Sequence, residues 1–258
     1  MVRRLIVLLA LCACTASAVS LKDIIARMSV GGAPPVDLTQ NLQHYWRGAT
    51  GTNDSGSTPQ SLITYGTITA STNGWDFGTG DTNYFRVNGP ITNGTSYTIS
   101  VWAKPNKTAM DANDYGGWIF EDRAGNDDWH VVYWKSTGKF LSTYWNNFVT
   151  ASDLHSTNAV VNAVWVHIAV VMDNASGNGS GTQSIYINGS LSASKTMITN
   201  NPRDASTLNA VIGGQYASLG YPYSKYHGEL DNIRFYSTNK PASFIQAIYD
   251  SEKGAKGL

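Results

Sequence analysis

Two carboxylates separated by one residue, Glu229 and Asp231, are the first residues whose spacing suggests chemistry. They lie in the segment GELDNIRFY at 228–236, which otherwise has the pattern of a β-strand. Residues two apart on a strand point to the same face of a sheet, and two carboxylates on one face can cleave a glycosidic bond or hold a metal ion. The spacing leaves three interpretations open: a catalytic pair, a metal site, or a strand that closes the fold.

A second candidate is an aromatic hairpin over HVVYWKSTGKFLSTYW at 130–145, for which we predict a turn near Thr137 and Gly138. Trp134 would then pair with Leu141, and alternate residues would point to opposite faces. Since only one face can lie in a core, the other is expected to expose large rings suited to stacking on sugars. The candidate ligand-binding residues are Trp129, His130, Tyr133, Trp134, Tyr144, Trp145 and Asn146. The alternative is that these rings form cross-strand pairs that only stabilise the sheet.

Other kinds of site have little support in the sequence. There is no G-x-S-x-G motif, and the histidines show no metal-ligand spacing with one another. The formal net charge is zero at neutral pH, so bulk charge attracts neither nucleic acid nor an anionic membrane. We therefore expect no nucleic-acid partner.

The N-terminus has the pattern of a secretory signal peptide over residues 1–18. MVRR is a basic region, LIVLLALCA is an apolar stretch, and Ala16-Ser17-Ala18 is a small-residue cleavage site. The chain has no other long apolar run, so we expect a secreted, extracellular protein without a membrane span. The stretch LCAC at 11–14 also resembles a bacterial lipobox, and cleavage there would leave a lipid anchor on Cys14 at the cell surface.

The elements that must position the candidates are almost all β-strands. YTISVWAKP at 97–105 alternates, WVHIAVVMD at 165–173 is typical of a strand buried on both faces, and Asn188-Gly189 marks a hairpin turn. Only about Ser243 to Tyr249 has a helical pattern near the end of the chain. The sequence predicts an all-β fold, a two-sheet antiparallel β-sandwich of the jelly-roll type with a short C-terminal helix.

The expected organisation is one domain with two flanking segments. Residues 19–40 have a short helical pattern at 21–28 and then a Gly- and Pro-rich spacer, so we interpret them as an N-terminal extension. The domain spans 41–251, and 252–258 form a C-terminal tail.

Five segments, in order along the chain, resemble a known family. They are LQHYW with NDSG (42–46 and 53–56), YTISVWAKP (97–105), WVHIAVVMD with QSIYINGSLSAS (165–173 and 183–194), LNAVIGGQ (208–215), and the stretch from GELDNIRFY to QAIY (228–249). Together they resemble the laminin-G-like jelly rolls of the concanavalin A-like superfamily. The resemblance implies two antiparallel sheets packed face to face, and a role in binding glycans, proteins or lipids.

The resemblance also bears on the carboxylates. Glycosidases on this fold carry three acids in the pattern E-x-D-x-x-E, whereas here Arg234 takes the place of the third acid. Relatives often hold a structural Ca²⁺ where the first and last strands meet, which implies Asp231, Asp54 and Asn53 as ligands. The alternative for Asp231 is that it only accepts hydrogen bonds from a neighbouring turn. Lyases on this fold use tyrosine–histidine pairs, for which His130 and Tyr144 are loose candidates.

We therefore expect a secreted, non-catalytic module for glycan binding or adhesion, whose partner is a polysaccharide or a glycoprotein glycan. One alternative is a structural or protein-interaction component of a cell surface or particle, with no small ligand. The other is a polysaccharide-active hydrolase or lyase on the same fold. Exposed rings on a concave patch would favour binding, buried rings would favour the structural role, and ionisable groups converging in a cleft would favour catalysis.

Overall fold

The computed structural model describes residues 36–80, 82–89, 91, 96–113, 115–124, 127–146, 149–173, 181–196, 210–215 and 225–258. The helix predicted at 21–28 lies outside these residues. The chain divides into two units, residues 1–36 and 37–258, and the second unit contains every described strand.

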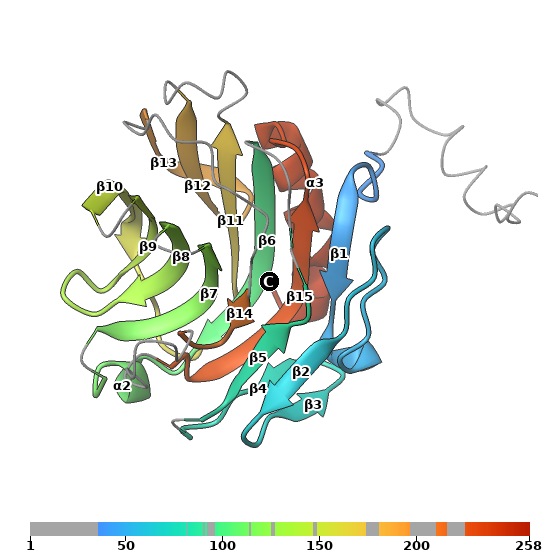
Figure 1. Ribbon diagram of the computed structural model, residues 1–258, viewed down its shortest axis with the longest axis vertical. Helices are drawn as coiled ribbons and strands as arrows, with labels where there is room; N and C mark the ends of the chain where they lie inside the picture. The colour runs from blue at the N-terminus through green and yellow to red at the C-terminus, as the bar shows by residue number, and fades with distance from the viewer. Residues whose placement is uncertain are drawn as a thin grey trace, which may run out of the picture. The chain divides into compact units, whose positions relative to one another are not determined.

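Two antiparallel sheets make up the described part of the second unit (Figure 1). Sheet A has the order β13-β12-β11-β6-β15-β4-β3, and β1 also pairs with β15. Its strands are β1 (Leu42–Trp46), β3 (Thr69–Ser71), β4 (Gly74–Asp76), β6 (Tyr97–Pro105), β11 (Val166–Asp173), β12 (Thr182–Ile187), β13 (Ser190–Thr196) and β15 (Gly228–Tyr236).

Sheet B has the order β10-β9-β8-β7-β14-β5-β2. Its strands are β2 (Leu62–Tyr65), β5 (Tyr84–Val87), β7 (Gly116–Ala124), β8 (Asp127–Trp134), β9 (Lys139–Asn146), β10 (Val149–Ala159) and β14 (Val211–Ile212). The fold is the predicted antiparallel β-sandwich.

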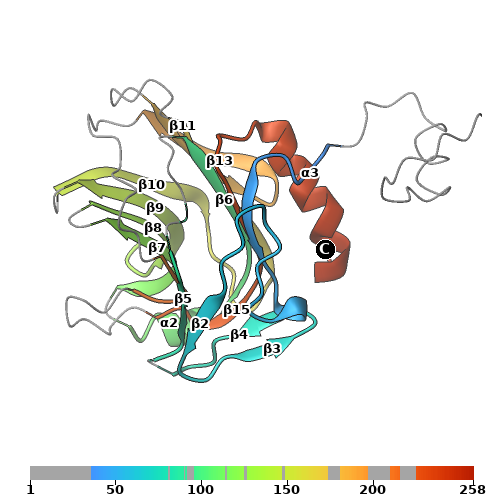
Figure 2. The same ribbon diagram turned by 45° about the vertical axis from the view of Figure 1, so that its right-hand side comes forward.

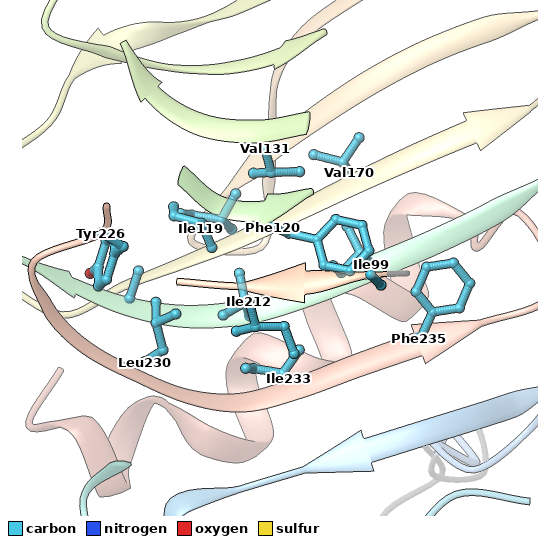
Figure 3. Packing of buried hydrophobic residues seen from close by; sticks show 14 of the residues in the cluster. Ile99, Ile119, Phe120, Val131, Val170, Ile212, Tyr226, Leu230, Ile233 and Phe235 are labelled. Carbon is cyan, nitrogen blue, oxygen red and sulfur yellow. The ribbon is translucent and has the colours of Figure 1, made fainter. Parts of the chain in front are cut away.

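The main core lies between the sheets and takes alternate residues from both. Figure 3 shows Ile99, Ile233 and Phe235 of sheet A packed near Phe120 and Val131 of sheet B. Burying such side chains contributes roughly 25 cal/mol for each Å² of apolar surface removed from water. β6 and β11 have the predicted bounds within one residue, and β11 is buried on both faces as its apolar run indicated.

Both predicted hairpins are present. Asn188 and Gly189 have positive φ angles of 49° and 79° in the turn between β12 and β13, as the Asn-Gly pair requires. In the β8–β9 hairpin Trp134 pairs with Lys139 and not with Leu141 as predicted, because the loop contains all of Lys135–Gly138. A shift of two residues leaves each side chain on its predicted face.

Two β-bulges decide which side chains point outward. In β7 the register shifts between Trp118 and Phe120, which places Trp118 and Glu121 on the outer face of sheet B. In β15 the shift lies between Asp231 and Arg234, so both of these charged residues point to the outer face of sheet A.

The outer face of sheet A is covered by the C-terminal helix, α3 (Ala242–Glu252), which a short 3₁₀ turn, η4 (Lys253–Lys256), follows. Figures 1 and 2 show α3 beside sheet A, on the side away from sheet B. Phe244, Ile245 and Ile248 pack against a second apolar cluster on that face. The sequence gives no clear signal for the short helical elements η1 (Gly48–Thr50) and α2 (Lys107–Met110). Within the described ranges, no helix has the length and apolar character needed to cross a membrane.

Candidate functional site

Asp231 connects the closing strand to two other segments on the outer face of sheet A. Its Oδ1 accepts a hydrogen bond from the Gly48 amide at 2.9 Å, and its Oδ2 accepts one from Lys256 Nζ at 2.7 Å. Lys256 also donates to the Asn73 carbonyl oxygen at 2.7 Å and lies 4.1 Å above the Trp165 ring. The Asp231 and Lys256 side chains are only 7% and 3% exposed, so this ion pair holds η4 against the sheet.

Glu229 has a different partner. Its Oε1 lies 2.7 Å from Lys104 Nζ on the neighbouring strand β6. Each of the two carboxylates is held in an ion pair with its own lysine, so neither is free to act as the acid or the nucleophile of glycoside hydrolysis. Arg234, which replaces the third acid of the glycosidase pattern, makes a two-pronged ion pair with Glu252 of α3. Trp102 Nε1 donates to the same Glu252 carboxylate at 2.7 Å.

Asp54 lies at the other end of the sequence and organises the loop after β1. Its carboxylate accepts hydrogen bonds from the amides of Tyr45, Gly56 and Gln60 at 2.7–2.8 Å and lies 2.7 Å from His44 Nδ1. Burial alone would raise the pKa of Asp54, but these donors together hold the pKa below its ordinary value. Its neighbour Asn53 is exposed.

The arrangement of Asp54 and Asp231 does not fit a shared calcium ion. Calcium takes six to eight oxygen ligands, whereas every carboxylate oxygen of these two residues already faces a nitrogen. Among the described residues, no group of three or more His, Cys, Asp or Glu side chains is arranged to hold a metal ion. The structural Ca²⁺ that the family resemblance implies stays a prediction, and the contacts of Asp54 and Asp231 argue against it.

The outer face of sheet B carries an aromatic patch. We define it as Trp118, Trp134 and Tyr115, together with the aliphatic residues Val132 and Leu141. Trp134 is half-buried, and Tyr115, 54% exposed, stacks on it with ring centroids 6.2 Å apart. Trp118 is 4% exposed, and its indole N–H is buried without a hydrogen-bond partner. The patch therefore combines accessible rings with an unused donor.

The other predicted ligand-binding residues lie elsewhere. Trp129 and Tyr133 are fully buried in the main core, where Trp129 Nε1 donates to Ser142 Oγ and the Tyr133 hydroxyl donates to Asp111. Their rings are therefore packed away from solvent. The three remaining candidates lie in β9, and their side chains fall outside the described part of the chain; they are Tyr144, Trp145 and Asn146.

His130 sits on the outer face of sheet B beside the aromatic patch, with its ring centroid 5.8 Å from that of Trp118. It pairs across the sheet with Glu121, and His130 Nε2 lies 3.7 Å from Glu121 Oε1. Both side chains are at most 1% exposed. Sequence reasoning did not select Glu121, because only the bulge in β7 brings it to the same face as His130.

A second aromatic pair lies on the same face, at the β2 edge of sheet B. Tyr65 and Tyr84 are directly paired and stack in parallel, with ring centroids 4.5 Å apart and an interplanar angle of 6°. Lys225 Nζ lies 4.4 Å from the Tyr84 ring, and Arg86 follows Tyr84 on the same face of β5. These residues were not among the predicted site residues. The alternation in YFRV at 84–87 could have indicated a strand with Tyr84 and Arg86 on one face.

The fold and the residues it displays define a class of lectin-like β-sandwich. A family model of laminin-G type, described as the concanavalin A-like lectin/glucanases superfamily, matches residues 77–246. The match covers well over half of the chain, so the chain belongs to this family. No curated protein matches its sequence.

Solved structures share the fold at low sequence identity. Domain 4 of AbnA, a GH43 extracellular arabinanase from Geobacillus stearothermophilus solved with arabinotriose, has a TM-score of 0.61 and 16% identity, and the match covers 81% of this chain and 98% of that domain. The receptor-binding domain of a botulinum neurotoxin C/D mosaic serotype has a TM-score of 0.63 and 14% identity, and the match covers 83% of this chain. The matched part is about half, 52%, of that toxin domain. These likenesses describe the fold and not the ligand.

Proposed function

We propose that the protein is a non-catalytic glycan-binding module and that the aromatic patch on sheet B is its binding surface. The observation that carries the proposal is the buried indole N–H of Trp118, which has no partner and lies beside the accessible rings of Trp134 and Tyr115. A buried donor without an acceptor costs about 1–3 kcal/mol. The C–H face of a sugar would stack on these rings, and a small side-chain movement that exposes the Trp118 N–H would let a sugar hydroxyl accept its hydrogen bond.

The family and one of the structural neighbours support this proposal. A domain with the same fold was solved with arabinotriose, although the low identity leaves the choice of sugar open. The leader at residues 1–18 supports export. A polysaccharide or a glycoprotein glycan outside the cell would then be the partner.

A second candidate is a structural or protein-interaction component. The burial of Trp129 and Tyr133 favours it, because two of the rings predicted to meet a ligand instead stabilise the core. A third function, cleavage of polysaccharides, has no comparable support, since Glu229 and Asp231 have separate lysine partners.

The test uses the full chain with a panel of plant, algal and animal polysaccharides, and measures retention and product release in the same tubes. Retention without new reducing ends or unsaturated sugars, weakened about fivefold in Trp134→Ala, supports the proposal, because stacking on an aromatic ring contributes about 1 kcal/mol. Leu191→Ala, which removes an exposed apolar side chain from sheet A, serves as the control. Product release would overturn the proposal in favour of an enzyme, and no retention would favour the structural role.

A further inference from the structure

Arg86 is an arginine whose charge is not used by the described fold. It lies on the outer face of sheet B, paired across the strands with Ile63 on one side and Val211 on the other. Its side chain is half-buried, and its Nε is buried without a hydrogen-bond partner. Among the described residues it has no ion pair and no hydrogen bond through its side chain. A guanidinium that is partly removed from water in this way favours a ligand that supplies an anion.

The acidic residue in the same row of the sheet does not neutralise Arg86. Glu121 pairs with Val211, so it lies two strands away from Arg86, or about 10 Å across the sheet. The Glu121 carboxylate lies 3.7 Å from the imidazole of His130 on β8, on the side away from Arg86. The positive charge of Arg86 is therefore available to a molecule that approaches this face.

The groups beside Arg86 suit a sugar ring. Tyr84 lies two residues before Arg86 on β5, about 7 Å along the strand and on the same face. Tyr65 stacks on Tyr84, and both rings are half-buried, so part of their surface is accessible. Lys225 is only 3% exposed, and its Nζ lies 4.4 Å from the Tyr84 ring, so it supports that ring from the protein side. Rings and a planar guanidinium thus lie side by side, where a sugar bearing a carboxylate could stack and form a bidentate ion pair.

We propose that the glycan bound by this module carries carboxylates, as uronic acids do, and that Arg86 with Tyr65 and Tyr84 forms the subsite that recognises the acidic sugar. This inference rests on the proposed function and adds a chemical class of ligand to it. The subsite lies on β5 and β2, on the same face as the aromatic patch, and β14 separates it from β7.

The experiment measures binding of the full chain to trisaccharides of galacturonic, glucuronic and mannuronic acid by calorimetry. Each trisaccharide is used as the free acid and as its neutral methyl ester, which has the same rings without the charge. At low salt we expect the best acid to bind about tenfold more tightly than its ester, as one charge-assisted bidentate contact provides. The preference should shrink as salt is raised, because the subsite is partly exposed.

Substitutions at Arg86 test whether this residue causes the preference for the acid over its ester. Arg86→Gln should abolish the difference between acid and ester. Arg86→Lys should retain part of this difference, since it keeps the charge and loses the planar fork. Arg47→Gln is the matched control, because Arg47 is an exposed arginine that also lies near a tyrosine, 5.9 Å from the Tyr45 ring, but belongs to the segment after β1 of sheet A. It should leave the preference unchanged.

The outcomes separate this inference from the proposed function. Equal binding of acids and esters, or retention on neutral polysaccharides alone, would overturn the carboxylate subsite and leave the glycan-binding proposal standing. A preference that survives in Arg86→Gln, or tighter binding of a sulfated trisaccharide than of any uronate, would also overturn it. Failure of every saccharide and polysaccharide to bind would overturn both.

Discussion

The two outer faces of the sandwich differ in how their polar groups are used. On sheet A, Asp231, Arg234 and Trp102 all point outward, and the C-terminal segment supplies a partner to each through Lys256 and Glu252. On sheet B, the indole N–H of Trp118 and the guanidinium of Arg86 also point outward, and within the described residues neither has a partner. The apolar cluster on this face consists of Trp118, Val132, Trp134 and Leu141. Its described side chains all come from strands of sheet B itself, β7, β8 and β9.

The difference shows which outer face is covered and charge-matched by the chain itself. Sheet A receives both apolar cover and matching charges from one helix, so its outer face is part of the folded interior. On sheet B, unused donors and accessible rings stand together, as expected of a surface that meets an external molecule. Four measurements test this contrast between the two outer faces.

The largest effect is expected when the Arg234–Glu252 pair is broken. Glu252→Ala leaves the buried Arg234 guanidinium without its carboxylate, so we expect the free energy of unfolding to fall by about 3 kcal/mol. Arg86→Gln, which removes an arginine of the other face, should change it by less than about 0.5 kcal/mol. Urea titrations of both variants measure this, and similar losses would remove the contrast between the faces.

The second-largest effect is expected on the free energy of unfolding when the pH is lowered. Burial, with a contribution from Arg234, lowers the pKa of His167 from an ordinary 6.5 to about 3, and its Nε2 lies 2.7 Å from Ser100 Oγ under α3. The folded state therefore holds a neutral imidazole, while the unfolded chain binds a proton below 6.5. This stability is complete above pH 6.5 and is lost as the pH falls toward 3.

At pH 5 the loss should be about 2 kcal/mol, from 1.36 kcal/mol for each pH unit below the unfolded pKa. Melting curves between pH 7 and pH 5 measure it. His167→Gln should flatten this part of the profile, and an equally steep profile in that variant would show that other groups cause the loss.

A smaller effect distinguishes two buried tryptophans, one on each outer face. Trp102→Phe removes an N–H that donates to Glu252 and should cost about 1–2 kcal/mol. Trp118→Phe leaves a similar cavity but removes an N–H without a partner, so it should cost about 1 kcal/mol less than Trp102→Phe, while weakening glycan binding. Equal losses in the two variants, measured by urea unfolding, would indicate that the Trp118 N–H has a partner in the folded protein.

The smallest expected effect is that of removing calcium. Lys256 already supplies a positive charge to Asp231, and four N–H groups satisfy Asp54. EDTA should therefore leave the melting temperature of the wild type unchanged. A fall in the wild type that is absent from Asp231→Ala would contradict this expectation and would restore the shared calcium site that the family resemblance implied.

The sequence was sufficient for much of the fold because its strongest signals are local. The alternation in β6, the apolar run of β11 and the turn at Asn188 and Gly189 each depend on a few adjacent residues. The bulges at Trp118 and Asp231 could not be predicted, since one extra residue changes which face every later side chain occupies.

The candidate site was only partly predictable for the same reason. The sequence placed Trp134 and Tyr133 on opposite faces of an aromatic hairpin, but it could not tell which face is exposed, because the burial of Tyr133 depends on the opposite sheet. Tyr65 and Arg86 lie far from the aromatic hairpin in sequence and join its face only through the order of strands in sheet B. Local patterns carry no information on that order.

The position of β15 in sheet A has a consequence for how the chain is made. This strand lies between β6 and β4 and also pairs with β1, so it joins segments that are synthesised long before it. The ribosome must therefore deliver residue 236 before sheet A can close, and residue 256 before its outer face is sealed. Until then the nascent chain exposes apolar strands and unpaired edges, the features that make an incomplete chain prone to aggregation.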